Sequence, residues 1–212
     1  MKIGVFSGTF DPIHSGHIAF ADQCLQTGLN KVLFMPEPIP RRKVNVSLLK
    51  HRLAMINLAI ENNRRMESFV PPDHQNHTPR ATHALLVKRF GKGHEFWIML
   101  GGDVFEHIDK WQDSDDKIRN LEHIKRYSFL VGLRTEDDGE TAVKIRDELK
   151  LDARLITSYL PAAASSVIRR QLMQGQRELD DLSPEVEKYV IKNGLYGTAD
   201  RKGHPQRKTK AA

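Results

Sequence analysis

Residues 7–17, which read SGTFDPIHSGH, decide the fold of this chain. They follow an apolar run, Lys2–Phe6, that is typical of a buried strand, and they precede Ile18–Leu25, whose apolar residues have helical spacing. Two glycines, one proline and two histidines therefore lie at a turn between a strand and a helix. In an α/β fold such a turn lies at the carboxyl end of a strand, where ligands bind.

The residues of this turn are suited to binding a phosphate. Gly8 and Gly16 let the backbone approach a ligand closely, and the following helix presents free N–H groups at the positive end of its dipole. His14 and His17 are three residues apart, so both point toward one anion if Ser15 opens the helix. The alternative is a capped turn with two solvated histidines, which the preceding strand and the G-T-F-D-P context disfavour.

Strand and helix patterns alternate along the rest of the chain. Further strands are expected at residues 32–35, 68–70, 96–100, 128–133 and 154–157, and helices at 48–60, 82–90, 140–149, 166–173 and 184–191. Ser47 is the expected cap of the 48–60 helix, and residues 134–139 are expected to form an acidic loop. The alternation predicts an α/β fold with a mostly parallel sheet and helices on both faces.

The composition is typical of a single domain from a reducing compartment. Apolar residues make up 39% of the chain, which is enough for a core, and no apolar run approaches the roughly 20 residues of a membrane span. The single cysteine, Cys24, has no partner for an internal disulfide, which indicates a reducing compartment. The N-terminus has no secretory pattern. We therefore expect a cytoplasmic protein without a membrane partner.

The positive charge is concentrated at the C-terminus. The net charge is +6, and residues 201–212 hold five cations and no acid. We expect residues 1–200 to form the domain and residues 201–212 to form a basic, disordered tail. The alternative for the tail is an arm that binds nucleic acid.

A proline-rich segment, Pro36–Lys43 (PEPIPRRK), follows the second predicted strand and ends in three cations. Its prolines stiffen the loop, and an anion nearby would relieve the repulsion among the cations. An anion bound near the three cations is therefore one interpretation of this segment, and a solvated basic loop is the alternative.

A second candidate segment follows the strand expected at residues 96–100. Asp103 comes directly after this strand, where its carboxylate can accept hydrogen bonds from a ribose. Trp111, eight residues later, offers a flat face on which an aromatic ring can stack. A helix cap and core packing are the alternative roles of these two residues.

A third candidate segment is Ala164–Arg169. Ser165 and Ser166 open the expected helix, and Arg169 lies one turn inside it. Hydroxyl, backbone N–H and guanidinium donors in this arrangement can hold a triphosphate. The alternative is a capped helix start with a solvated arginine.

The four segments, in this order, resemble the nucleotidyltransferase superfamily. The turn is similar to its signature G-[ST]-F-D-P-x-H-x-G-H, whose H-x-G-H element is shared with class I aminoacyl-tRNA synthetases. The chain is too short for such a synthetase and has no lysine loop like K-M-S-K-S. Gly101–Trp111 and Ala164–Arg169 resemble the G-x-D-x(7)-W and I-S-S-T-x-I-R elements of nicotinate mononucleotide adenylyltransferases. The resemblance covers residues 1–197 and implies a Rossmann-like, doubly wound sheet.

The resemblance also implies a reaction and a set of site residues. It implies transfer of AMP from ATP to nicotinate mononucleotide, with Mg²⁺ arriving bound to ATP and no metal site in the protein itself. The implied catalytic residues are His14, His17 and Arg169. The implied ATP-binding residues are Gly8, Thr9, Phe10, Gly16, Asp103, Ser165 and Ser166, and the implied mononucleotide-binding residues are Lys43, Thr82 and Trp111.

Two segments depart from the family pattern. Arg41 and Arg42 stand where the family has proline and histidine, and Ala81 stands where its P-S-Y-T stretch has tyrosine, leaving the hydroxyl of Thr82. The choice of substrate is therefore less constrained than the reaction. The alternatives are another H-x-G-H transferase, acting on nicotinamide mononucleotide or pantetheine phosphate, and a non-catalytic nucleotide-binding module.

Overall fold

A computed structural model of the chain describes residues 1–40, 43–111, 122, 124–156 and 163–198, so the basic tail lies outside the described residues. The strands of the described part form one sheet in which every neighbouring pair is parallel. The strands are β1 (Lys2–Gly8), β2 (Lys31–Pro36), β3 (Met66–Ser68), β4 (Glu95–Gly101), β5 (Ser128–Gly132) and β6 (Asp152–Ile156). Their order is β3-β2-β1-β4-β5-β6, so the winding direction reverses between β1 and β4.

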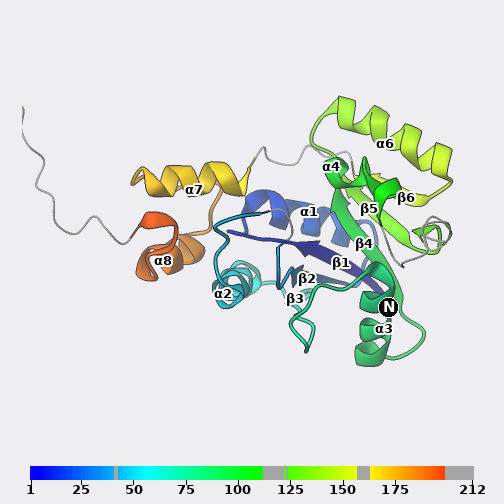
Figure 1. Cartoon of the computed structure of the whole chain (residues 1–212), viewed down its shortest axis with the longest axis horizontal. Coiled ribbons are helices and arrows are strands. Elements are labelled where there is room, and N and C mark those ends of the chain that lie inside the picture. The colour runs from blue at the N-terminus through cyan, green and yellow to red at the C-terminus, as the bar shows by residue number, and fades with distance from the viewer. Residues whose placement is uncertain (41–42, 112–121, 123, 157–162, 199–212) are drawn as a thin grey trace, which may run out of the picture.

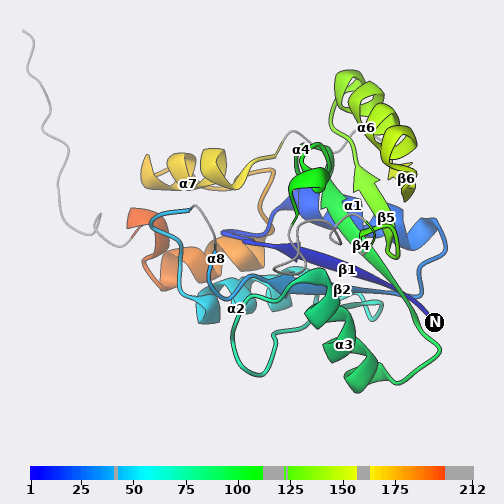
Figure 2. The same cartoon turned by 45° about the vertical axis from the view of Figure 1, so that its right-hand side comes forward.

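Helices connect the strands, as the alternating sequence pattern predicts. They are α1 (Ser15–Gln26), α2 (Leu49–Ile60), α3 (Pro79–Phe90), α4 (Gly102–Phe105), α6 (Glu136–Leu149), α7 (Ser165–Met173) and α8 (Pro184–Lys192), with 3₁₀ turns η1 (Ile108–Lys110) and η2 (Leu195–Gly197). Figures 1 and 2 show α7 and α8 together at the left of the molecule and α6 at its upper right. The predicted doubly wound α/β fold is confirmed.

Both faces of the sheet are covered because side chains alternate between them along each strand. Phe6 and Met99 point to the face packed by α1, α2, α7 and α8. Val5 points to the opposite face, where α3 packs, and Leu100 points to the part of that face covered by α4 and α6. The buried Cys24 belongs to the first cluster, and burial raises the pKa of its thiol, so it is a structural residue.

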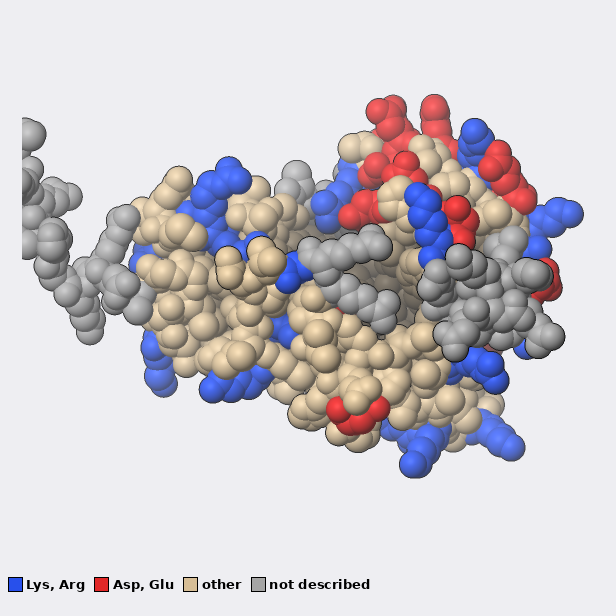
Figure 3. Space-filling model, in the orientation of Figure 1, with Lys and Arg blue, Asp and Glu red and all other residues tan. Residues whose placement is uncertain are grey.

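Three local predictions are wrong. Ser47 does not cap α2, because the helix starts one residue later than expected, with Leu48 as its N-cap, and the backbone N–H of Ser47 donates to Asp11 Oδ2 at 3.2 Å. The expected acidic loop is the first turn of α6, since Thr135 caps this helix and acids there suit the helix dipole. These acids contribute to the red cluster over α6 in Figure 3. The third strand spans residues 66–68 instead of 68–70, because Met66 pairs with Val32.

The reversal of strand order positions the site. Ligands of open α/β sheets bind beyond the carboxyl ends of the strands at the point where the winding reverses, which here lies between β1 and β4. Figure 3 shows a hollow in the surface between the α7 side and the α6 side of the molecule. No helix among the described residues is long and apolar enough to cross a membrane.

Candidate active site

The turn after β1 brings the two histidines together. α1 begins at Ser15 with His14 as its N-cap, as the phosphate-site interpretation requires. The imidazole rings of His14 and His17 lie 3.7 Å apart between centroids, with their planes 31° from parallel. The pair therefore lies at the carboxyl end of β1 and the start of α1.

His17 is held in one orientation. Its Nδ1 accepts a hydrogen bond from the backbone N–H of His14 at 3.2 Å, and the Phe10 ring packs edge-on against it with centroids 5.0 Å apart. A neutral imidazole has one donor and one acceptor nitrogen. We therefore assign the proton of neutral His17 to Nε2, which leaves an Nε2–H donor for a ligand.

Both imidazoles are neutral at pH 7 in the protein without ligand. Burial, together with the charge of Arg134, lowers the pKa of His14 from 6.5 to about 4, and the charge of Asp181 opposes this shift. Burial also lowers the pKa of His17 well below 6.5, and the charges of His14, Arg134 and Lys43 add to that effect. The Nδ1 atom of His14 is buried without a hydrogen-bond partner. An anion at the pair would oppose these effects on the two pKa values.

Arg134 is a cation of the site that sequence reasoning missed. It lies two residues beyond the end of β5, and its backbone N–H donates to Asp138 Oδ2 at 3.0 Å. Its exposed side chain acts electrostatically on both histidines. Because ligands bind at the carboxyl ends of parallel strands, the position of Arg134 after β5 is a signal for a site residue. The acidic residues that follow it instead led to the interpretation of residues 134–139 as an acidic loop.

The start of α7 reaches the same turn. The Arg169 guanidinium donates from Nη1 to the carbonyl of Asp11 at 2.7 Å, and the Ser165 hydroxyl donates to the carbonyl of Pro12 at 2.9 Å. Ser166 is exposed. The structure thus brings the third candidate segment against the turn, where Ser165 and Arg169 also brace its backbone.

Gly8 and Phe10, at the start of the turn, also pack against each other, in addition to the ATP-binding role expected of them. A Cβ atom at Gly8 would lie 3.0 Å from the Phe10 ring, so the absence of a side chain there lets Phe10 pack. Phe10 is 2% exposed and adopts a φ of 50°, a conformation that non-glycine residues rarely take. Strained backbone of this kind is typical of ligand sites. Thr9 and Gly16 are also buried at this turn.

The candidate ATP contact Asp103 and the three candidate mononucleotide contacts lie on separate elements. Asp103 is exposed in the first turn of α4, directly after β4. Trp111 follows η1 and is half-buried against the cluster that contains Phe105. Thr82 is half-buried near the start of α3, and Lys43 is exposed. Arg41 and Arg42 lie outside the described residues.

Comparison with known proteins agrees with this geometry. A cytidylyltransferase-like family profile matches residues 5–171. Nicotinate-nucleotide adenylyltransferase of Bacillus subtilis (strain 168) is 31% identical over 202 residues, which cover 92% of this chain and 98% of that protein. A Dictyoglomus turgidum protein named "Probable nicotinate-nucleotide adenylyltransferase" is 31% identical over 210 residues, covering 95% and 98%. This chain belongs to the nicotinate-nucleotide adenylyltransferase family. Its members are nucleotidyltransferases, and this chain is such an enzyme.

A solved structure of the same family shares the fold. Plasmodium falciparum nicotinic acid mononucleotide adenylyltransferase complexed with NaAD superposes with a TM-score of 0.68, covering 92% of this chain and 97% of that chain. The sequence identity is 19%, so the likeness supports the fold alone.

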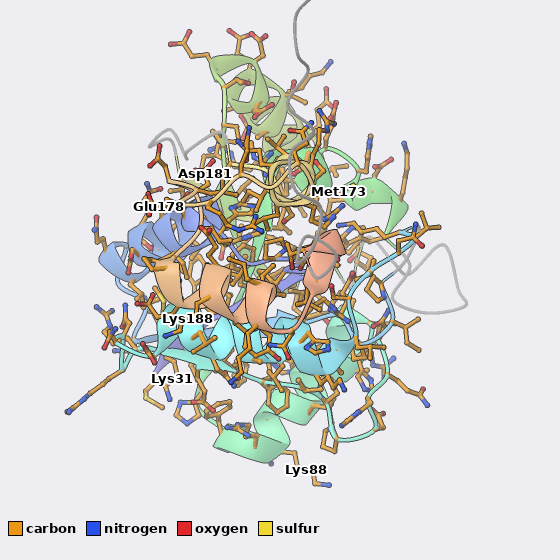
Figure 4. The ribbon with its side chains drawn as sticks, turned by 90° about the vertical axis from the view of Figure 1, so that its left-hand side faces the viewer. Lys31, Lys88, Met173, Glu178, Asp181 and Lys188 are labelled. Atoms are coloured by element: carbon orange, nitrogen blue, oxygen red, sulfur yellow. The ribbon has the colours of Figure 1, made fainter. Side chains whose placement is uncertain are left out.

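Two residues near the C-terminus also hold the adenylyltransferase turn. Asp181 accepts from the Ser15 hydroxyl at 2.9 Å, and its carbonyl accepts from the Ser15 N–H at 2.9 Å. Figure 4 shows Asp181 in the segment that leads into α8. Tyr196 donates its hydroxyl to Asp11 Oδ1 at 2.7 Å, and burial with the Asp11 charge raises its pKa, which keeps it a donor. Local sequence patterns missed both contacts because their partners lie far apart in the chain.

Metal binding was assessed from the donor side chains. Within the described ranges, no group of three or more His, Cys, Asp and Glu side chains is placed to hold a metal ion. Mg²⁺ commonly binds through substrate phosphates, waters and only one or two protein carboxylates.

Proposed function

We propose that this chain transfers AMP from ATP to nicotinate mononucleotide, giving deamido-NAD and pyrophosphate. The observation that carries the proposal is the stacked pair of neutral histidines, 3.7 Å apart, at the start of α1 with Lys43 and Arg134 in electrostatic range. Imidazoles with lowered pKa values are weak bases, so these two side chains are better suited to donating hydrogen bonds to phosphates than to removing protons. The named relatives support the choice of substrates.

Adenylyl transfer depends more on positioning of the two substrates than on proton transfer. The 5′-phosphate of the mononucleotide is largely ionised at neutral pH, so it attacks the α-phosphorus of ATP without a general base. A bond forms from its oxygen to the α-phosphorus, the bond to the bridging oxygen breaks, and pyrophosphate leaves with that electron pair. Charge accumulates on the phosphate oxygens, where fixed donors lower the barrier.

We assign the histidines and cations to those oxygens. The Nε2–H of His17 donates to the α-phosphate, and His14 donates beside it. Arg169 uses one of its five N–H donors on the Asp11 carbonyl, so the others remain for the leaving pyrophosphate together with Ser166. Lys43 and Arg134 add positive charge around the site.

The remaining assignments concern nucleosides and metal. Asp103 accepts from a ribose hydroxyl, Trp111 stacks on the pyridine ring, and Thr82 borders the pyridine pocket. Thr9, Phe10 and Gly8 present backbone groups to the α-phosphate. Mg²⁺ bound to ATP would neutralise part of the phosphate charge, and the donors of the chain act on the phosphate oxygens that it leaves free.

Pyrophosphate release tests the proposal directly. The full chain is incubated with ATP and Mg²⁺ plus nicotinate mononucleotide, nicotinamide mononucleotide or phosphopantetheine in parallel. We expect the highest kcat/KM with nicotinate mononucleotide. A preference for either other acceptor would transfer the assignment to that acceptor, and ATP binding without release from any of them would indicate a non-catalytic binding module.

The Trp111 assignment predicts a selective kinetic defect. Trp111→Ala removes the stacking face, so the KM for the mononucleotide should rise on the order of tenfold while the KM for ATP changes little. Steady-state kinetics with each substrate varied in turn measures both values. Equal increases in the two KM values would contradict stacking on the pyridine.

A further inference from the structure

Arg52 is the most deeply buried cation among the described residues. It lies near the start of α2, and its side chain is 1% exposed. Arginine is almost never fully buried unless its donors are satisfied. The motifs that indicate the reaction do not include it, so its burial needs a separate explanation.

The guanidinium of Arg52 binds three backbone carbonyls from three segments. Nη1 donates to Thr9 at 3.0 Å, Nη2 donates to Pro38 at 3.3 Å, and Nε donates to Ser47 at 2.9 Å. Thr9 belongs to the phosphate-binding turn, Pro38 to the loop after β2, and Ser47 to the entry into α2. A planar guanidinium with fixed donor directions holds its acceptors in one relative geometry.

Neighbouring contacts join the same segments. The N–H of Glu37 donates to the carbonyl of Gly8 at 2.9 Å, and the N–H of Ser47 donates to Asp11 Oδ2 at 3.2 Å. Burial lowers the pKa of Arg52, while the charges of Asp11 and Glu37 act against that shift. The loop from residue 37 to residue 47 is therefore joined to the turn at both of its ends, with Arg52 as the link common to both.

This loop carries Lys43 to the histidine pair. The charge of Lys43 acts on His17, although the two residues lie on different segments. Their separation depends on how the loop after β2 sits on the turn after β1, which is the geometry that Arg52 controls.

We propose that Arg52 is a positioning residue for adenylyl transfer, which locks the loop carrying Lys43 onto the phosphate-binding turn. It contacts no substrate and acts through the backbone of both segments. The inference rests on the proposed function for its kinetic consequences, and it also predicts a property of the protein without substrates.

The kinetic test compares Arg52→Lys and Arg52→Met with the wild-type chain. Lysine keeps the charge but cannot span three carbonyls, so both variants should lose kcat/KM, the methionine variant on the order of 10²-fold. Assays are run at a temperature where circular dichroism shows every variant folded. Ile60→Val, a buried change on the same helix away from the loops, is the control for destabilisation and should keep wild-type kcat.

A double-mutant cycle separates positioning from general stability. If Arg52 acts by placing Lys43, then Lys43→Ala should cost much less in the Arg52→Lys background than in the wild type. Additive losses in kcat/KM, or wild-type kcat/KM in Arg52→Lys, would overturn the proposal.

Amide hydrogen exchange without substrates provides a readout independent of the reaction. We expect the amides of Glu37 and Ser47 to exchange at least tenfold faster in Arg52→Met than in Ile60→Val. Equal protection in the two variants would overturn the role of Arg52. Inactivity of the wild-type chain with every acceptor would instead overturn the proposed function and leave this exchange result to be judged separately.

Discussion

At the scale of single residues, the site depends on histidines that are neutral before they meet a ligand. Burial and the charges of Arg134 and Lys43 oppose protonation of His17. ATP phosphates bring the opposite charge, so substrate binding favours the donor forms of both rings. The cations that suppress protonation in the free protein are the ones proposed to hold the phosphates.

His14 should make stability depend on pH. Its pKa is about 4 in the folded chain and 6.5 when exposed, so the unfolded chain binds the extra proton between these values. The free energy of unfolding should therefore fall as pH drops from 6.5 to 4, by up to about 3 kcal/mol. Urea unfolding at pH 7 and pH 5 should show a smaller difference for His14→Gln than for wild type or for the exposed control His107→Gln. The same difference in all three would contradict this assignment.

Two substitutions of His17 should show which of its ring nitrogens contacts the phosphates. Glutamine places a donor where Nε2 lies, whereas asparagine reaches only the position of Nδ1. If Nε2–H serves the phosphates, His17→Asn should lose kcat on the order of 10²-fold and His17→Gln should lose less. Greater activity in the asparagine variant would show that Nδ1 is the nitrogen that matters.

At the scale of elements, the contacts that complete the site come from α7 and from the segments on either side of α8. The carboxylate of the buried Glu187 on α8 accepts from the N–H groups of Glu178 and Leu179 at 2.9 and 3.1 Å. This bond shapes the segment that carries Asp181 to Ser15 at the start of α1. α8 therefore supports the phosphate-binding turn through this segment.

Glu187→Gln should weaken that support. The amide nitrogen cannot accept, so one part-buried N–H loses its partner, at a cost of about 1 kcal/mol. We expect Tm to fall by several degrees, measured by thermal unfolding with Glu185→Gln, an exposed change on the same helix, as control. An unchanged Tm would mean that the carboxylate does not hold this segment.

Local patterns predict the elements and the candidate segments but not their mutual contacts. The alternation of apolar runs predicts the sheet, and the turn at Gly8–His17 predicts a ligand site at its edge. Ser47 reads as a cap from its neighbours, yet its N–H binds Asp11, 36 residues away. Arg52 reads as one more polar residue of α2, since its three carbonyl partners have no sequence signature. The periodicity of apolar residues shows which side of a helix or strand faces the core. It carries no information about backbone partners that lie far away in the chain.

At the scale of the whole molecule, the charge is distributed unevenly. Acids lie over α6, visible in Figure 3, while five of the cations belong to residues 201–212. The candidate site depends on cations of the domain itself, namely Lys43, Arg134 and Arg169. The tail is therefore not needed to explain phosphate binding.

Removing residues 201–212 should leave the enzyme unchanged. Among the described residues, Tyr196 is the last that contacts the phosphate-binding turn. The Tm and kcat/KM of the truncated chain should therefore match those of the full chain. Fluorescence anisotropy with a labelled DNA duplex at low salt tests the alternative for the tail, with the full chain as comparison. Binding by the full chain that is lost on truncation would identify the tail as a nucleic-acid arm.

The contacts of Asp11 determine when the site is completed during synthesis and folding of the enzyme. The backbone carbonyl of Asp11 binds Arg169, 158 residues away, and its carboxylate binds Tyr196, 185 residues away. The turn is synthesised well before these two partners, which follow it by 158 and 185 residues. Pairings of such long sequence separation form late in folding. A nascent chain that has completed β1 to β6 therefore holds the sheet and the histidines, but gains its finished site only when α7, α8 and η2 dock.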